Sequence, residues 1–131
     1  MERALRTSLG KDDVSSVLII DDDLDIRREV SEILREEGLD VMTASNGGEA
    51  LRLLRSSLPP SVVLLDLMMP GTSGWEFRRT QLAEPALASI PVLVFSSFDS
   101  GPRNAADLRA QGFLSKPCSI AELLAAIEPF R

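Results

Sequence analysis

Five polar side chains lie at the ends of apolar runs that are far apart in the sequence. Each run is typical of a buried strand, so each polar residue marks a point where a strand leaves the core. Carboxylates, a hydroxyl and an ammonium group gathered in one place can bind a divalent cation and accept a phosphoryl group. The five residues are Asp21 with Asp22, Asp66, Ser96 and Lys116.

The acidic pair Asp21 and Asp22 directly follows the apolar run Val17–Ile20. Unit charges about 5 Å apart repel by roughly 3 kcal/mol at an effective dielectric constant near 20. A hard cation with oxygen ligands would relieve that repulsion. We therefore interpret the pair as metal ligands, whereas Asp25 is expected only to cap the helix that follows.

Two other motifs share these acidic residues. Asp21, Asp23, Asp25 and Glu32 match carboxylate positions of an EF-hand calcium loop, but Ile26 stands where that loop requires glycine. A predicted strand also precedes the loop, so we reject the EF-hand. The spacing of Asp21 and Asp23 resembles the nucleophile motif of haloacid-dehalogenase-type phosphatases. That alternative needs further acidic motifs and usually a cap, and it stays open here.

The other three polar residues suit phosphoryl transfer. Asp66 follows Val62–Leu65, and a carboxylate beside a bound cation can attack phosphorus and carry an acyl phosphate. Ser96 follows Val92–Phe95 and could donate a hydrogen bond to a phosphoryl oxygen. Lys116 could pair with Asp66 before the reaction and with the phosphoryl group after it.

Short apolar runs alternate strictly with amphipathic segments. Five strand–helix pairs predict an α/β fold, a parallel sheet with helices on both faces. In such a sheet the crevice for ligands lies at the carboxyl ends of the strands, where the five polar residues fall. The predicted strands are Val17–Ile20, Val41–Ala44, Val62–Leu65, Val92–Phe95 and Phe113–Leu114; the predicted helices are Asp25–Glu37, Asn46–Leu54, Ser73–Pro85, Pro102–Gly112 and Ser119–Ile127.

Particular residues predict where the helices begin and end. Asn46 and Ser119 are expected to cap helix starts, and Gly38 and Gly112 are expected to end helices. Ile120 is assigned to the apolar face of the last helix.

Composition excludes several classes of protein. The 131 residues include 14 basic and 20 acidic ones, and this net charge of −6 argues against direct binding to nucleic acid or anionic membranes. No stretch approaches the roughly 18 apolar residues of a membrane span. A single cysteine, Cys118, fits a reducing cytosol, so we expect a cytoplasmic protein. We predict a flexible N-terminal extension over residues 1–13 and one domain over residues 14–131.

From about Val17 to Ile127 the chain resembles the response-regulator receiver domain of two-component signalling, the CheY-like family. The resemblance implies a doubly wound, flavodoxin-like (βα)5 fold, a three-layer sandwich with parallel strand order 2-1-3-4-5. The matching pieces are Ile20-Asp21-Asp22, Asp66-x-x-Met69-Pro70-x-x-x-Gly74, Ser96 after a strand, and Lys116-Pro117.

The resemblance also implies roles for the acidic residues. Asp66 matches the phosphoacceptor. Asp21 and Asp22 match the acidic pair that holds Mg²⁺ (or Mn²⁺), and Asp66 and the backbone carbonyl of Met68 complete the protein ligands.

Further roles concern switching. Ser96 matches the switch hydroxyl, Lys116 the phosphate-binding lysine and Phe113 the switch aromatic, and the Lys116–Pro117 peptide bond is expected to be cis. Phe113 lacks a tyrosine hydroxyl, and the alternative that it is only a core residue stays open. Side chains beside the pocket, here Met68 and Ser97, are expected to influence the phosphorylation rate.

The resemblance implies a histidine kinase or a phosphotransfer protein as the phosphoryl donor. A downstream protein would bind the face formed by the fourth helix, the fifth strand and the fifth helix. The domain would catalyse its own phosphorylation and dephosphorylation without being a separate enzyme, as a monomer or a weak phosphorylation-dependent dimer. The alternative is a pseudo-receiver, an adaptor that binds proteins without phosphorylation.

Overall fold

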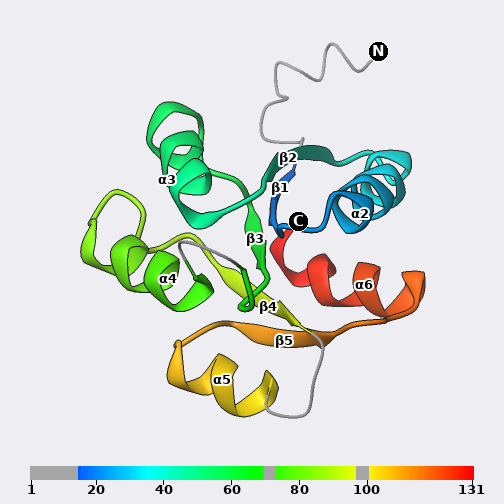
Figure 1. Cartoon of the computed structure of the whole chain (residues 1–131). Coiled ribbons are helices and arrows are strands. Elements are labelled where there is room, and N and C mark those ends of the chain that lie inside the picture. Colours follow the sequence, from blue (N-terminus) through cyan, green and yellow to red (C-terminus); the bar gives the residue numbers. More distant parts are fainter. Residues whose placement is uncertain (1–14, 70–72, 97–100) are drawn as a thin grey trace.

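The computed structural model describes residues 15–69, 73–96 and 101–131, without the side chains of residues 101 and 102. The predicted extension over residues 1–13, and Ser97, lie outside this part of the chain. Strands and helices alternate as predicted (Figure 1). The elements are β1 (Ser16–Ile20), α2 (Leu24–Glu36), β2 (Asp40–Ala44), α3 (Gly47–Ser56), β3 (Val62–Leu65), α4 (Gly74–Ala83), β4 (Val92–Ser96), α5 (Gly101–Asp107), β5 (Gly112–Ser115), α6 (Ile120–Ile127) and a closing 3-10 turn, Glu128–Phe130.

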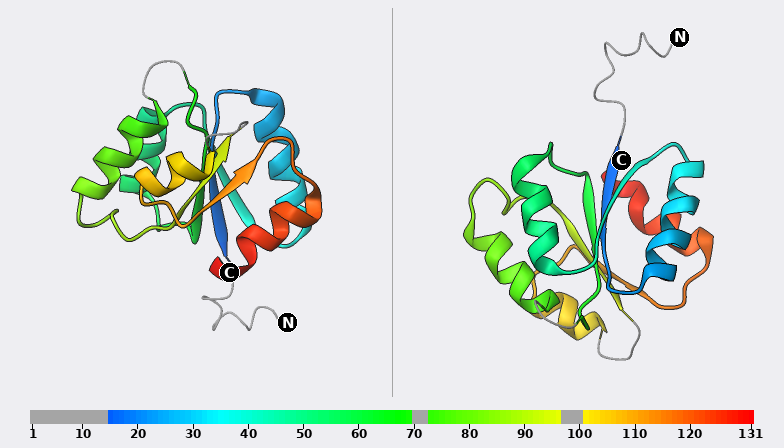
Figure 2. Two further views of the ribbon diagram at one scale, coloured as in Figure 1. Left: turned by 90° about the horizontal axis from the view of Figure 1, so that it is seen from below. Right: turned by 45° about the horizontal axis from the view of Figure 1, so that its top comes forward.

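The five strands form one parallel sheet in the order β2-β1-β3-β4-β5, which confirms the predicted topology. Helices α2 and α6 cover one face of the sheet, and α3, α4 and α5 cover the other (Figures 1 and 2). Alternate residues of β3 therefore enter different cores: Val63 and Leu65 pack on the α3–α5 side, and Val62 and Leu64 on the α2–α6 side. Burial on both faces explains why this strand is a continuous apolar run.

Strand register brings the polar residues to one edge of the sheet. Ile20 of β1 is the partner of Leu65 of β3, so Asp21 and Asp66 follow paired residues. The backbone N–H of Asp66 donates a hydrogen bond to the Ile20 carbonyl at 2.9 Å. The two carboxylates thus leave the sheet side by side.

The N-cap of α2 is Asp23, so the prediction that Asp25 caps this helix is wrong. The Asp23 side chain accepts hydrogen bonds from the backbone N–H groups of Asp25 at 2.9 Å and Ile26 at 3.2 Å. Asp23 has the extended backbone angles of an N-cap residue, whereas Asp25 already lies in the first turn of the helix. The predicted caps Asn46 and Ser119 are confirmed.

One predicted helix end and one predicted buried position are wrong, while the other helix end is confirmed. Helix α5 ends at Asp107, and Arg109, at φ 57°, takes the left-handed conformation expected of a glycine. Gly112 is instead the first residue of β5. Ile120 is 56% exposed and does not join the buried face of α6. Gly38, at φ 85°, follows α2 as predicted.

A buried arginine joins α4 to the chain that follows α5. Arg78 is only 2% exposed. Its Nε donates to the Leu108 carbonyl at 3.0 Å, and its Nη2 donates to the Arg109 carbonyl at 2.8 Å. Its Nη1 donates to Oε1 of Gln81 at 2.8 Å, and Gln81 in turn donates to the carbonyl of Ile90. Burial lowers the pKa of the Arg78 guanidinium, and these acceptors replace its lost hydration.

Replacing Arg78 by alanine is expected to lower the free energy of unfolding by about 3 kcal/mol, because two carbonyls and an amide lose their charged donor. Urea denaturation measures this change. The neighbouring Arg79 is exposed, and Arg79→Ala is the matched control, with an expected change within about 0.5 kcal/mol. Equal effects of the two substitutions would contradict the structural role of Arg78.

Within the described part of the chain, no helix is both long and apolar enough to cross a membrane.

Candidate functional site

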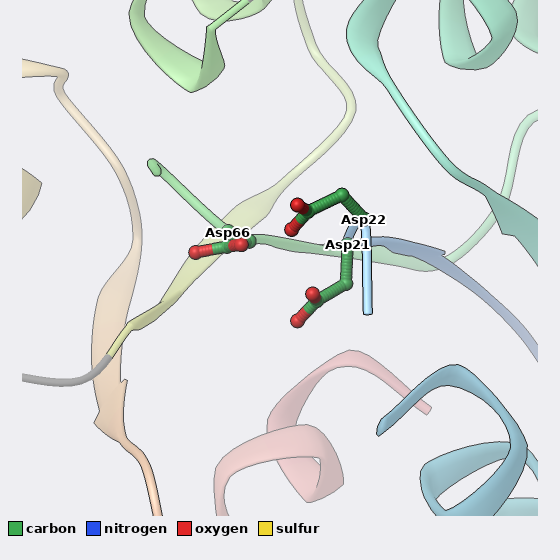
Figure 3. Close-up of side chains that lie close together, drawn as sticks. All are labelled: Asp21, Asp22 and Asp66. Atoms are coloured by element: carbon green, nitrogen blue, oxygen red, sulfur yellow. The ribbon is translucent and has the colours of Figure 1, made fainter. Parts of the chain in front are cut away.

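Three carboxylates meet at the carboxyl end of the sheet (Figure 3). One oxygen from each of Asp21, Asp22 and Asp66 lies within 4.8 Å of the others. Asp21 is 1% exposed and Asp66 is 5% exposed, while Asp22 is open to solvent. Two of the three carboxylates are therefore removed from water. Repulsion between them is stronger in the protein interior than it would be in water.

Asp21 is held in place by the backbone around it. Its N–H donates to the Ala44 carbonyl of β2 at 3.1 Å, and its Oδ1 accepts from the N–H of Asp23 at 3.0 Å. The guanidinium of Arg27, one turn into α2, donates from Nη1 to the Asp21 carbonyl at 2.7 Å. Sequence reasoning missed this role of Arg27, because the bond depends on how α2 folds back over β1.

Lys116 is the cation of the site. Its Nζ lies 2.5 Å from Oδ2 of Asp21 and 3.8 Å from Oδ2 of Asp66, and its side chain is 16% exposed. Its backbone N–H donates to the Ser96 carbonyl at 3.0 Å, which aligns the end of β5 with the end of β4. The peptide bond between Lys116 and Pro117 is cis.

Asp66 combines burial with few compensating contacts. Its Oδ1 accepts a hydrogen bond from the N–H of Met68 at 3.2 Å. Burial raises the pKa of Asp66 to about 6, the Lys116 charge opposes this rise, and Asp21 and Asp22 add to it. The carboxyl group is thus held next to like charges that one ammonium group only partly neutralises.

The residues present fit a bound divalent cation. Carboxylate oxygens are the ligands that Mg²⁺ prefers, and three of them are within reach of one ion. Burial, and to a smaller extent the charges of Asp21 and Asp22, raise the pKa of Asp66, and a bound cation would favour its ionised form. Met68, whose backbone carbonyl is predicted as a further ligand, lies at the rim and is 75% exposed.

The two predicted switch residues lie on neighbouring strands. Ser96, the last residue of β4, is 1% exposed. Phe113 of β5 pairs in register with Val94 of β4 and is half-buried against the core on the α3–α5 side. Phe113 contacts the core that also contains a residue of α5, and Ser96 lies on the neighbouring strand. A movement of either residue stays a prediction.

Gly74, the first residue of α4, passes very close to the backbone at Asp66. A Cβ atom on Gly74 would lie 2.7 Å from the Asp66 carbonyl oxygen and 2.8 Å from Cα of Leu67. Only glycine fits at that distance, which explains its place eight residues after Asp66 in the motif.

Replacing Gly74 by alanine is expected to destabilise the fold by about 2 kcal/mol or more, because the new methyl group meets backbone rather than a movable side chain. Thermal or urea unfolding measures this change. Gly48, early in α3, is the matched control, since its added Cβ would meet only Oδ1 of Asn46 at 3.4 Å. Gly48→Ala is expected to be neutral or to stabilise by about 0.5 kcal/mol. Tolerance of alanine at Gly74 would show that the backbone there relaxes.

Comparison with known proteins gives a family match. The model of the response regulator receiver domain matches residues 17–128. Protein PilG of Pseudomonas aeruginosa is 36% identical over 115 residues, which cover 86% of this chain and 84% of PilG. Several other curated relatives are longer, and the chain spans only 46% to 54% of their length.

Solved structures show the same similarity. Chemotaxis protein CheY4 of Vibrio cholerae superposes with a TM-score of 0.82 at 28% identity, over 90% of this chain and 99% of CheY4. Response regulator TrrA of Thermotoga maritima, solved in complex with Mg²⁺-BeF, gives a TM-score of 0.80 at 26% identity, over 90% of this chain and 100% of TrrA.

Proposed function

Because the chain belongs to the family of response regulator receiver domains, we propose that it accepts a phosphoryl group on Asp66. The donor is a phosphohistidine of a histidine kinase or a phosphotransfer protein. A carboxylate oxygen of Asp66 forms a bond to phosphorus, the phosphorus–nitrogen bond breaks, and its electron pair leaves with the imidazole. The product is an acyl phosphate on Asp66.

The observation that supports this proposal is the position of Asp66. Its carboxyl group lies at the open end of the sheet, within 3.8 Å of the Lys116 ammonium and next to Asp21 and Asp22. Lys116 also contacts Asp21. The same ammonium group can therefore stabilise the carboxylates before the reaction and the phosphoryl oxygens after it.

A divalent cation, Mg²⁺ or Mn²⁺, would be held by Asp21, Asp22, Asp66 and the Met68 carbonyl. When bound, it neutralises the charge that the carboxylates and the phosphoryl oxygens bring together. TrrA, a relative of known structure, was solved with Mg²⁺-BeF, which supports Mg²⁺ as the cofactor here.

After transfer, the phosphoryl group offers new acceptors to the Lys116 ammonium and the Ser96 hydroxyl. Movement of Ser96 toward the phosphoryl group would open space for Phe113. The equilibrium between two arrangements of the α5–β5–α6 face would then shift, and a downstream protein would bind one of them. The domain acts in the cytoplasm through protein partners rather than nucleic acid, as a monomer or a weak phosphorylation-dependent dimer, and its only chemistry is its own phosphorylation and dephosphorylation.

Acetyl phosphate, a small phosphoryl donor, tests the proposal without a partner. Intact-protein mass spectrometry is expected to show one added phosphoryl group in the presence of Mg²⁺ and none when EDTA removes the metal, because the three carboxylates otherwise repel the donor. An unchanged mass under both conditions would favour a phosphorylation-independent adaptor. Sustained release of phosphate from stable phosphate esters would instead indicate the phosphatase alternative.

A further inference from the structure

Arg27, which contacts the Asp21 carbonyl, also lines a polar pocket outside the acidic cluster. A pocket of about 430 Å³ is formed between α2 and the edge strand β2, and Arg27, Arg28, Ser31, Arg35 and Thr43 are among its lining residues. Such a volume lies within the usual range for small-molecule sites. None of the roles proposed above uses this pocket, apart from the contact of Arg27 with the Asp21 carbonyl.

The lining of the pocket is cationic although the chain as a whole is acidic. Arginine residues 27, 28 and 35 contribute three guanidinium groups, and Glu32 contributes one carboxylate. Among the described residues, none of these three arginines has an acidic partner within 4 Å. Arg27 donates to the backbone carbonyl of Asp21, and Arg35 donates to that of Val41 at 3.2 Å. The lining thus carries three positive charges and one negative charge.

A buried hydroxyl adds a second, independent sign of a ligand. Ser31 is 3% exposed, and its Oγ is the one buried side-chain oxygen or nitrogen of the described residues that lacks a hydrogen-bond partner. Such a group is costly to bury unless something pairs with it. Ser31 lines the pocket and lies one helical turn from both Arg27 and Arg35, and a serine hydroxyl can turn to donate to a ligand.

From these contacts we propose that the pocket between α2 and β2 binds a small molecule with a diphosphate group. A guanidinium group can bind two phosphate oxygens at once, and the hydroxyls of Ser31 on α2 and Thr43 on β2 supply further donors. Arg28 and Arg35 are about 10 Å apart along the helix axis, which suits two linked phosphates better than one.

The probe is inorganic pyrophosphate, titrated into the metal-free protein at constant ionic strength, with inorganic phosphate in parallel. Amide NMR signals of α2 and of Thr43 are expected to shift, and pyrophosphate is expected to bind about tenfold tighter than phosphate because it engages both ends of the pocket. Shifts confined to Asp21, Asp66 and Lys116, or no shift at millimolar pyrophosphate, would overturn the proposal.

Paired variants separate specific binding from general charge. Arg28→Gln with Arg35→Gln is expected to weaken pyrophosphate binding more than tenfold, since both ends of the ligand lose a donor. Arg52→Gln with Arg79→Gln removes the same charge from exposed positions on α3 and α4 and is expected to change binding less than about twofold. Equal losses of pyrophosphate affinity in the two double variants would show that binding depends only on total charge, and would refute a specific site.

Ser31→Ala gives a readout that does not depend on the arginines. Removing an unpartnered buried hydroxyl is expected to raise the melting temperature by about 3 °C, while pyrophosphate binding weakens by about threefold or more. Opposite changes in stability and affinity distinguish a ligand contact from a packing role. A more stable variant with unchanged affinity would exclude Ser31 from the site and contradict the proposal.

Discussion

Asp66→Asn is expected to abolish phosphorylation by acetyl phosphate and to prevent the tight binding of beryllofluoride. The substitution keeps the size of the side chain and an oxygen that can accept the Met68 N–H bond. An amide is not nucleophilic enough to attack phosphorus, so the added mass seen in the wild type should fall below detection. Mass spectrometry follows the acyl phosphate, and fluorine NMR follows beryllofluoride.

The control for this prediction is an acid close to the site but outside the carboxylate cluster. Asp25 lies in the first turn of α2 and is exposed, so Asp25→Asn removes one charge without touching the three clustered carboxylates. Its phosphorylation should match the wild type within about twofold. If Asp66→Asn reacted as fully as Asp25→Asn, another residue would have to be the phosphoacceptor.

The second large effect concerns stability without metal. Asp66→Asn is expected to raise the free energy of unfolding at neutral pH by up to about 3 kcal/mol, because the wild-type carboxylate must ionise next to Asp21 and Asp22 in a buried position. That magnitude corresponds to the rise of the Asp66 pKa from 3.8 to about 6. Urea denaturation in EDTA measures it.

The pH dependence follows from the direction of that shift. Well below pH 4 Asp66 is protonated in both the folded and the unfolded chain and contributes no difference. As pH rises toward 6, the unfolded chain releases the proton while the folded chain keeps it, so the wild type loses stability. Well above pH 6, where Asp66 is ionised in both states, the loss is complete and constant. The advantage of Asp66→Asn should therefore grow between pH 4 and 6 and then level off.

Magnesium should reduce this difference. At ten times its dissociation constant it is expected to stabilise the wild type by about 1.4 kcal/mol, and Asp66→Asn by less, because one anionic ligand is lost. If Asp66→Asn were less stable than the wild type in EDTA, attraction between Lys116 and Asp66 would outweigh the repulsion among the carboxylates. No stabilisation of the wild type by millimolar Mg²⁺ would count against the metal site.

Local signals in the sequence were sufficient for the order of the elements and the place of the site. Continuous apolar runs such as Val62–Leu65 can only be buried on both faces, and alternation with amphipathic helices then requires a parallel sheet. The polar residues Asp21, Asp66 and Ser96 end such runs, so their convergence follows from the direction of parallel strands. These features depend on neighbours in sequence, and that is why they could be predicted.

Only the tertiary contacts determine which residue caps a helix and which partner each long side chain finds. Asp23 rather than Asp25 caps α2, since the sequence offers two acids only two residues apart and the backbone angles decide between them. The partners of Arg78 and Arg27 are carbonyl groups, which every residue possesses, and no sequence pattern marks which carbonyl a long side chain will reach. The unpaired Ser31 hydroxyl depends in the same way on how α2 packs over β2. The sequence alone thus determined where charge gathers, whereas packing between distant segments determined how each charge is held.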